Sequence, residues 1–248
     1  MHRSKIEWVL NPDNKTLGKI WNPITGCLNG CEYCYARRLA NGRLKHRYWA
    51  NDNLAPTPRD LVNYSLDPFY PRFWEDRLYE PCHIKKPSGI FTVDMGELFG
   101  DWIPEEWQKL VFSVIEACPQ HRFYLLTKQP QNLIKFSPFP SNCYVGVTIT
   151  CREAAHIANF YLPEIKAGVK FISFEPLLDD VMQYRYTWNL IRSCNWIIIG
   201  SQTKPLKLPQ KIWVDEIIEA ADKSSIPVFL KDNLKPLLGD NLRQELPE

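Results

Sequence analysis

The pattern of apolar and polar positions alternates along the chain between short apolar runs and longer stretches with helical spacing. Runs that are apolar at successive positions are typical of strands buried on both faces, as in parallel sheets covered by helices. The predicted strands lie at residues 89–93, 122–126, 144–149, 169–174, 196–199 and 227–230, with a weaker candidate at 18–25.

Three stretches between these runs repeat apolar residues at helical spacing, at residues 105–118, 152–167 and 211–224. In the first, Trp107 and Val111 belong to one apolar face, Pro104 suits a first turn, and Pro119 must end the helix. We expect the second helix to end at Gly168. The alternation of six or seven strands with helices predicts an α/β fold with a parallel sheet, closed into a partial or complete (β/α) barrel. The expected organisation is one domain over residues 1–248.

Residues 50–88 interrupt this rhythm with a stretch rich in proline and aromatic residues, which reads DPFYPRFW at 67–74. We interpret it as an insertion after the first helix. Such a segment suits a lid or substrate wall, or a crossover packed on the outside of the barrel.

Composition favours a globular protein in a reducing compartment. The chain has 45% hydrophobic and 23% charged residues, and its strongest apolar run, at 196–199, is far shorter than the about 18 residues of a membrane span. Residues 1–9, MHRSKIEWV, lack the apolar core of a secretory signal. We therefore expect a cytoplasmic protein without a membrane role, whose eight cysteines are not a disulfide framework.

Polar residues recur where each predicted strand ends. In parallel barrels the carboxyl ends of the strands carry the active site, so we expect these side chains to form one ring. They are Asp94, Gly96 and Glu97, then Thr127 and Lys128, Thr148 and Thr150, Ser173 and Glu175, Ser201 and Gln202, and Lys231 and Asp232.

The formal charge is only +2, yet residues 1–50 hold nine Lys or Arg against three acids. Within residues 35–49, five cations are interleaved with three aromatic residues. This pattern suits a nucleic-acid-binding surface, but the stripe is short, and we favour the simpler interpretation of a solvated helix face beside a negatively charged site.

Cys27, Cys31 and Cys34 have the spacing C-x3-C-x2-C in a glycine-containing loop. Three thiolates on so short a loop can bind one iron–sulfur cluster and leave one iron without a protein ligand. An open metal position indicates catalysis rather than a structural role. Alternatively, His46 could complete a Cys3His zinc site, or the three thiols could be unrelated.

With Tyr33 directly before the third cysteine, this motif resembles that of the radical S-adenosylmethionine (SAM) enzymes. The chain is most similar to a phage-associated family of radical-SAM-like proteins of unknown function. The similarity lies in KIEW at 5–8, WNPITGC at 21–27, CYA at 34–36, GELF at 96–99, LTK at 126–128, GVT at 146–148, FEPLL at 174–178 and IIG at 198–200.

The resemblance implies a [4Fe-4S] cluster and SAM as cofactors, with the cluster on the three cysteines and Tyr33 beside it. It implies that Gly96 and Glu97 receive the amino group of SAM, with Met95 in place of a glycine. It further implies that Lys128 pairs with the SAM carboxylate, that Thr148 meets the ribose, and that Glu175 faces cofactor or substrate.

The expected reaction is reductive cleavage of SAM to a 5′-deoxyadenosyl radical, with an external ferredoxin- or flavodoxin-like electron donor. The substrate is not readable from the sequence; a nucleic acid or another macromolecule is one candidate. Cys151, just after the strand at 144–149, is a candidate hydrogen-atom donor to a substrate radical. The rival interpretations are a zinc-binding nucleic-acid module and an iron–sulfur protein that only transfers electrons.

Overall fold

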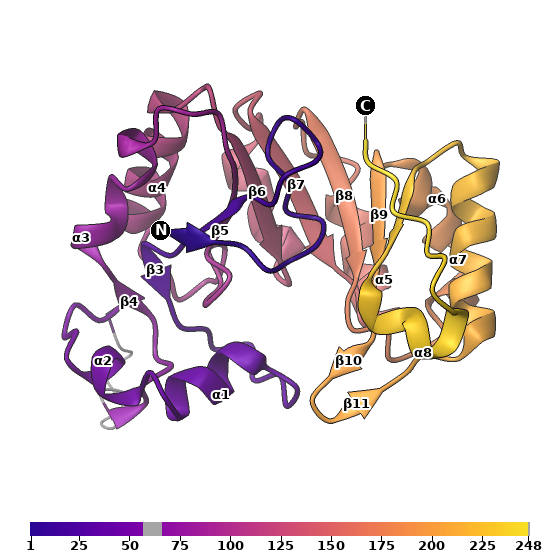
Figure 1. The fold of residues 1–248 in the computed structure, drawn as a ribbon, viewed down its shortest axis with the longest axis horizontal. Helices are drawn as coiled ribbons and strands as arrows, with labels where there is room; N and C mark the ends of the chain where they lie inside the picture. The colour runs from indigo at the N-terminus through magenta and orange to yellow at the C-terminus, as the bar shows by residue number, and fades with distance from the viewer. Residues whose placement is uncertain (57–65, 248) are drawn as a thin grey trace. The chain divides into compact units, whose positions relative to one another are not determined.

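The computed structural model of the chain describes residues 1–56 and 66–247. It has an α/β fold in which mostly parallel strands alternate with helices (Figure 1). The chain separates into two compact units, Met1–Lys5 with Val9–Phe123, and Ile6–Trp8 with Tyr124–Glu248. The predicted fold class is thus confirmed at the level of α/β with parallel strands.

In the first unit, β2 (Lys19–Trp21) pairs in parallel with β5 (Gly89–Thr92) and antiparallel with β1 (His2–Arg3). The strand predicted at 18–25 is split, because Pro23 has no N–H to donate to a ladder. The residues beyond it form β3 (Ile24–Thr25), which pairs antiparallel with β4 (Arg72–Phe73) from the predicted insertion.

The helices of the first unit are α1 (Tyr35–Asn41), α2 (Lys45–Trp49), α3 (Glu75–Leu78) and α4 (Glu105–Ala117), with a 3₁₀ turn η2 (Pro81–His83). Helix α4 confirms the prediction for 105–118, with Pro104 as its N-cap residue.

Residues 57–65 of the expected insertion at 50–88 lie outside the described part of the chain. The rest of the insertion packs against the residues around the cysteine motif. The Trp74 indole N–H donates to Thr25 Oγ1 at 2.8 Å, and the Cys27 N–H donates to the Phe69 carbonyl at 3.1 Å. Phe69 and Trp74 of the insertion thus contact the residues at the start of the cysteine loop.

The second unit contains most of β6 (Arg122–Thr127), then β7 (Cys143–Thr148), β8 (Val169–Phe174), β9 (Trp196–Ile199) and β12 (Val228–Leu230), neighbours in this order. The pairs β7–β8, β8–β9 and β9–β12 are parallel. Its helices are α5 (Arg152–Tyr161), α6 (Thr187–Arg192), α7 (Lys211–Lys223) and α8 (Lys235–Leu238). It also contains the hairpin β10 (Gln202–Thr203) and β11 (Leu206–Lys207), and the 3₁₀ turns η3 (Pro130–Phe136), η4 (Val181–Gln183) and η5 (Asp232–Leu234).

The main strands after the cysteine motif agree with the predictions to within one residue at either end. The helix predicted for 152–167 is wrong at its end: α5 stops at Tyr161, because Pro163 cannot continue the ladder. Gly168 has another role, since a Cβ there would lie 2.9 Å from the Ser141 carbonyl oxygen.

An aromatic cluster forms part of the core of the second unit. The Trp8 ring lies 5.8 Å from Tyr124, 5.7 Å from Phe171 and 6.0 Å from Trp196, measured between centroids. All four side chains are at most 1% exposed. Rings packed edge-on or tilted at these distances add stability beyond their buried area.

Candidate functional site

The cysteine motif lies in the loop between β3 and α1, and Gly26, directly before its first cysteine, is held against the turn that follows β5. The Gly26 N–H donates to the Met95 carbonyl at 2.9 Å, and the Glu97 N–H donates to the Gly26 carbonyl at 3.2 Å. Gly26 has φ +95°, and a Cβ there would lie 2.5 Å from the Tyr70 carbonyl oxygen. Only glycine fits this close backbone approach.

Two of the three sulfurs accept backbone hydrogen bonds. The Asn29 N–H donates to Cys27 Sγ at 3.4 Å, and the Arg37 N–H donates to Cys34 Sγ at 3.3 Å, which makes Cys34 the N-cap of α1. Cys27 and Cys34 also pack against a cluster of buried side chains, namely Ala36, Ala40, Tyr48, Phe69, Trp74 and Met95. Apolar packing and N–H···S hydrogen bonds are both features that tune iron–sulfur clusters.

Electrostatics at Cys27 disfavours an isolated thiolate. Burial, followed by the negative charge of Glu97, raises the pKa of the Cys27 thiol to about 12. A bound metal reverses this preference, since a coordinating thiol is deprotonated outright. The setting of Cys27 therefore suits a ligand to a positively charged centre better than a free nucleophile.

The turn after β5 is fixed by Asn22. Its side-chain Nδ2 donates to Asp94 Oδ1 at 2.6 Å, while its side-chain Oδ1 accepts from the Met95 N–H at 3.1 Å. The Tyr35 hydroxyl donates to the Asp94 carbonyl at 2.7 Å, and burial raises the pKa of Asp94. Val93 has φ +64°, a conformation that is strained for a β-branched residue and typical of functional sites.

Glu97 is 4% exposed and lies between this turn and the cysteine loop. Its Oε1 accepts from the Phe99 N–H at 3.1 Å, and its Oε2 accepts from the Asn29 amide at 3.3 Å. Gly96 forms an isolated parallel bridge with Gly26. The structure thus brings together, within one unit, the predicted residues Gly96 and Glu97 and the predicted cluster loop.

Two further residues were considered for the cysteine motif in the sequence, Tyr33 as a neighbour of the cluster and His46 as the fourth ligand of a zinc site. Tyr33 lies in the turn between Cys31 and Cys34, which is closed by the Cys34 N–H donating to the Cys31 carbonyl at 3.1 Å. His46 lies on α2, where its ring packs edge-on to Trp49 at 6.1 Å. Within residues 1–56 and 66–247, no three His, Cys, Asp or Glu side chains have the geometry of a single-ion site.

The three cysteines fit a cluster by the chemistry of their donors. None of them is in a disulfide, all three are half-buried, and they come from one short loop. A cuboidal cluster takes its thiolates on different irons, so its ligands need not converge on one ion.

In the second unit, polar groups gather at the carboxyl ends of β7, β8 and β12. Thr148 and Ser173 are in register as the last or next-to-last residues of their strands, and the Ser173 hydroxyl donates to Glu175 Oε2 at 3.5 Å. Glu175 also forms an ion pair with Lys231, whose ammonium lies 3.8 Å from Glu7 Oε2. Burial disfavours the charge on Lys231, but Glu175 and then Glu7 outweigh it and raise its pKa.

Gly200 leaves space for the Glu175–Lys231 pair, because a Cβ there would lie 2.9 Å from Lys231 Cδ and 3.3 Å from Glu175 Cγ.

Lys128 directly follows β6 and is half-buried. Cys151 is half-buried and is the N-cap residue of α5, so it lies where β7 turns into that helix.

Several residues of these arrangements were not predicted as site residues. Asn22 and Asn29 belong to the quoted cysteine region, and Glu7 to the KIEW motif, but their partners are 68 to 224 residues away in sequence and carry no local signal.

 Asn22 is 72 residues from Asp94, Asn29 is 68 residues from Glu97, and Glu7 is 224 residues from Lys231. Only the recurrence of polar residues at strand ends pointed to Lys231.

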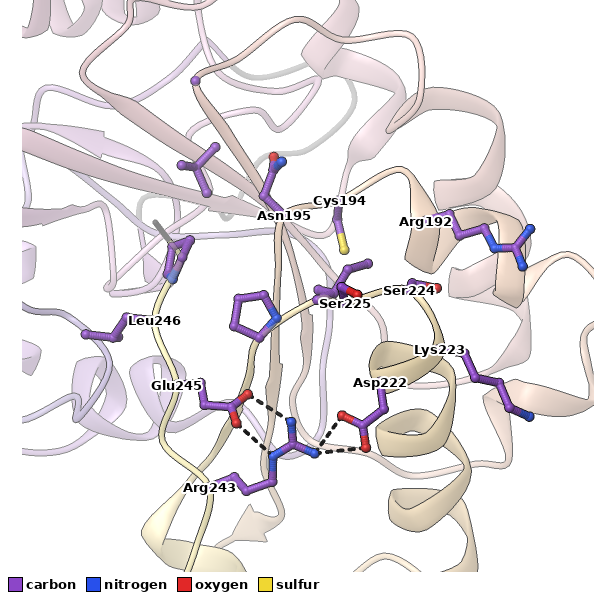
Figure 2. A pocket seen from close by; sticks show the side chains of 15 residues that line it. Arg192, Cys194, Asn195, Asp222, Lys223, Ser224, Ser225, Arg243, Glu245 and Leu246 are labelled. Atoms are coloured by element: carbon purple, nitrogen blue, oxygen red, sulfur yellow. Dashed lines mark hydrogen bonds and ion pairs between the residues drawn. The ribbon is translucent and has the colours of Figure 1, made fainter.

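The described residues also line a hollow at the opposite, amino-terminal ends of β8, β9 and β12 (Figure 2). Figure 2 shows Arg243 between Asp222 and Glu245, and its guanidinium lies 2.9 Å from a carboxylate oxygen of each. The hydrogen bond from Arg243 lowers the pKa of Glu245. These ion pairs hold the C-terminal segment beside β12, where the Glu245 N–H donates to the Val228 carbonyl at 3.1 Å. The hollow contains none of the residues predicted for the site.

In the part of the chain that the structure describes, no helix combines the length and apolarity needed to cross a membrane.

Comparison with known proteins identifies a family but no activity. Residues 3–235 match a family described as a protein of unknown function (DUF5131). The searches of curated proteins and of solved structures found no match. Because the match spans nearly the whole chain, including the cysteine loop and the strand ends described above, the chain belongs to the DUF5131 family of proteins of unknown function.

Proposed function

We propose that this protein is a radical SAM enzyme that holds a [4Fe-4S] cluster on Cys27, Cys31 and Cys34. When bound and reduced by an external ferredoxin- or flavodoxin-like donor, the cluster would supply the electron that cleaves SAM into methionine and a 5′-deoxyadenosyl radical, which takes a hydrogen atom from the substrate. The protein's own task is to bind, orient and shield the reactants.

One observation carries the proposal. The loop with three cysteines is fixed by backbone hydrogen bonds to the turn that ends in the buried carboxylate Glu97. A three-thiolate cluster has an open iron, and an amino acid bound there needs a partner for its ammonium group. Glu97 is a carboxylate beside the loop, which suits that task.

Other residues of the first unit would keep this arrangement rigid. Asn29 donates to Glu97 from within the cysteine loop, so a change in the loop alters the orientation of the carboxylate. Asn22 fixes Asp94 and Met95 at the start of the turn. Both contacts favour a preorganised ligand site.

The resemblance assigns further roles that rest on sequence alone. In it, Lys128 would pair with the SAM carboxylate, Thr148 would contact the ribose, and Glu175 would face the cofactor or the substrate. Cys151 is our candidate hydrogen-atom donor to the substrate radical. The ion pair between Glu175 and Lys231 favours a positioning role for Glu175, because the carboxylate is already neutralised by a lysine.

The proposal is tested by the metal content of anaerobically reconstituted protein. We expect about four irons and four sulfides per chain, and single replacement of Cys27, Cys31 or Cys34 with Ala should remove the cluster. His46→Ala is the control that should retain it. Stoichiometric zinc with little iron, or loss of the metal in the His46 variant, would instead support the zinc module.

A cluster that serves only in electron transfer is the second outcome to separate. Such a protein would carry the same iron and sulfide but would not bind SAM. Calorimetric titration of the clustered protein with SAM distinguishes the two, and we expect binding to depend on the cluster.

A further inference from the structure

The helical segment that follows the cysteine loop is strongly basic. Residues 35–49 contain five Lys or Arg residues and no Asp or Glu, and they span the whole of α1 and α2. Arg38, Arg43 and Arg47 are exposed there, and Lys45 is half-buried. We call the exposed part of these residues the basic α1–α2 surface.

Exposed aromatic rings lie among these cations. Trp49 is 41% exposed, and the Lys45 ammonium lies 4.4 Å from its ring centroid. Tyr35, at the start of α1, is 46% exposed. Cations interleaved with exposed rings are typical of surfaces where phosphates bind and bases stack.

Positive charge is also crowded at the buried edge of this surface. The guanidinium groups of Arg47 and Arg77 lie 5.8 Å and 3.6 Å from the centroid of the same ring, Trp74. Burial, followed by the charge of Arg47, lowers the pKa of Arg77, while Asp76 and Glu80 act in the opposite direction. An anion bound here would relieve the repulsion between the two guanidinium groups.

The basic surface is tied to the cysteine loop. Cys34 is the N-cap of α1, and Arg37 in the first turn donates to the Cys27 carbonyl at 3.2 Å. Arg37 also pairs with Asp67 at 3.0 Å, so its charge is already compensated. Arg43, Lys45 and Arg47 therefore lie on the segment that directly follows the helix anchored to the cysteine loop.

We propose that the basic α1–α2 surface binds single-stranded nucleic acid and brings it to the cysteine loop. This inference rests on the proposed function and names the substrate class of that enzyme. Phosphates would contact Arg43, Lys45 and Arg47, and a base would stack on Trp49. A duplex hides its bases from such a ring, and an acidic protein segment has no base to stack.

The test is fluorescence anisotropy with labelled 20-nucleotide single-stranded DNA and RNA of one mixed sequence, and the matching DNA duplex. We expect at least one single strand to bind more tightly than the duplex at 50 mM NaCl. Arg43→Glu/Arg47→Glu should weaken that binding at least about tenfold. It should also reduce the steepness with which the logarithm of the binding constant falls with the logarithm of the salt concentration, by about 1.4. Trp49→Ala should weaken it with little change in that slope.

The matched control is Lys211→Glu/Lys223→Glu, which reverses two exposed lysines of α7 and changes the net charge equally. It should leave binding unchanged within about twofold. Equal loss in both double variants, tighter binding to duplex, equal binding to polyglutamate, or no binding by the unaltered protein would each overturn the proposal.

This test is separable from that of the proposed function. The same titration on the protein in which Cys27, Cys31 and Cys34 are all replaced with Ala should retain binding, because the basic surface lies on α1 and α2. If the cluster forms and no nucleic acid binds, only the substrate class is wrong. If nucleic acid binds and no cluster forms, the proposed binding surface is supported and the proposed radical SAM activity is wrong.

A different observation concerns two other cysteines of the first unit. Cys118 Sγ lies 3.4 Å from Cys82 Sγ and donates to it. Cys82 is exposed on η2, whereas Cys118 is buried as the C-cap of α4, where burial raises its pKa to about 12. The exposed thiol can meet an oxidant, and the buried one lies within reach to complete a bond of about 2.05 Å.

We infer that Cys82 and Cys118 are a redox-active dithiol that a small-molecule disulfide oxidises. The Cys82 thiolate attacks oxidised glutathione and releases one glutathione thiolate, and the Cys118 thiolate then attacks the Cys82 sulfur and releases the second. Two electrons pass to glutathione disulfide, which becomes two thiols, and the two cysteine protons are taken up by these thiolates. The new bond would tie η2 to the end of α4.

The experiment treats the folded protein with oxidised glutathione and maps disulfide-linked peptides by mass spectrometry. We expect one dominant link, between Cys82 and Cys118, and a higher Tm for the oxidised protein because a long loop is closed. The link should persist when Cys27, Cys31 and Cys34 are replaced with Ala, and vanish in Cys82→Ser. Its absence from the folded protein, or its appearance only in urea, would overturn this inference.

Discussion

Glu97 combines burial with a full set of directional contacts, which is unusual for a carboxylate. It is 4% exposed, and its two oxygens accept from Phe99 and Asn29. Carboxylates are seldom buried unless paired or hydrogen-bonded, because leaving water is costly. At this position the negative charge is held in place beside the loop that would carry the cluster.

We predict that Glu97→Gln weakens SAM binding at least about tenfold without loss of the cluster, because the amide keeps the shape but loses the charge that attracts an ammonium. Isothermal titration calorimetry on the clustered protein measures this. Glu105→Gln, an exposed residue of α4 in the same unit, is the control and should bind SAM normally. Equal affinity in Glu97→Gln and Glu105→Gln would place the amino group of SAM elsewhere.

Lys231 gives a second prediction at this scale. Its side chain is 14% exposed and pairs with Glu175, so Lys231→Met should leave a poorly solvated carboxylate and lower the free energy of unfolding by about 3 kcal/mol. Lys211→Met, which breaks an exposed pair with Asp215, should lower it by about 0.5 kcal/mol. Urea denaturation measures both.

The dependence of this stabilisation on pH follows from the raised pKa of Lys231. A lysine whose pKa is higher in the folded protein stabilises it fully below its ordinary value of 10.5, and the stabilisation is lost as the pH rises through the folded value. The difference between Lys231→Met and the unaltered protein should therefore be constant from pH 7 to about 9.5. A difference that disappears already at neutral pH would show that the ion pair contributes little.

Part of the candidate site was readable at the level of single residues. The cysteine spacing is a local pattern, and Glu97 follows a strongly apolar strand, so both are visible in sequence. The partners of these residues are not, because Asn22 with Asp94 and Asn29 with Glu97 are brought together only by folding. The same holds for Cys82 and Cys118, which have no local spacing that pairs them.

At the scale of elements, the loop between β3 and α1 depends on two glycines with positive φ. Gly26 (φ +95°) would place a Cβ 2.5 Å from a backbone oxygen, whereas Gly30 (φ +71°) has no atom within 4 Å of that point. The two positions thus share the backbone conformation and differ in the space around them.

We predict that Gly26→Ala lowers the free energy of unfolding by about 3 kcal/mol or more, because a steric clash adds to the strain of a left-handed conformation. Gly30→Ala should lower it by only about 1 kcal/mol, the strain alone. Urea denaturation of the metal-free proteins measures the difference. Equal losses would mean that the loop does not approach Tyr70 as closely as described.

The elements were predictable where one local rule dominates. Continuous apolar runs identified the main strands, and proline and helical spacing identified α4. Predictions failed where a proline outweighed the apolar pattern, as at Pro163 after α5 and at Pro23 between β2 and β3. The pairing of β3 with β4 could not be predicted, since these two short strands lie 47 residues apart and depend on the insertion.

At the scale of the whole chain, the family match covers residues 3–235 and therefore both compact units. Each unit contributes polar residues at the carboxyl ends of parallel strands, the positions where such folds place their chemistry. The three thiols and Glu97 belong to the first unit, and the group formed by Glu175, Lys231 and Glu7 belongs to the second.

The most direct test of the account is SAM cleavage by the clustered protein under anaerobic conditions. After reduction with dithionite and addition of SAM, we expect 5′-deoxyadenosine and methionine in equal amounts, measured by liquid chromatography and mass spectrometry. Cys34→Ala should form neither product, while Cys194→Ala, which alters a buried cysteine of the second unit, should form both. A protein with its full complement of iron and sulfide that forms no 5′-deoxyadenosine above the dithionite control would contradict the account.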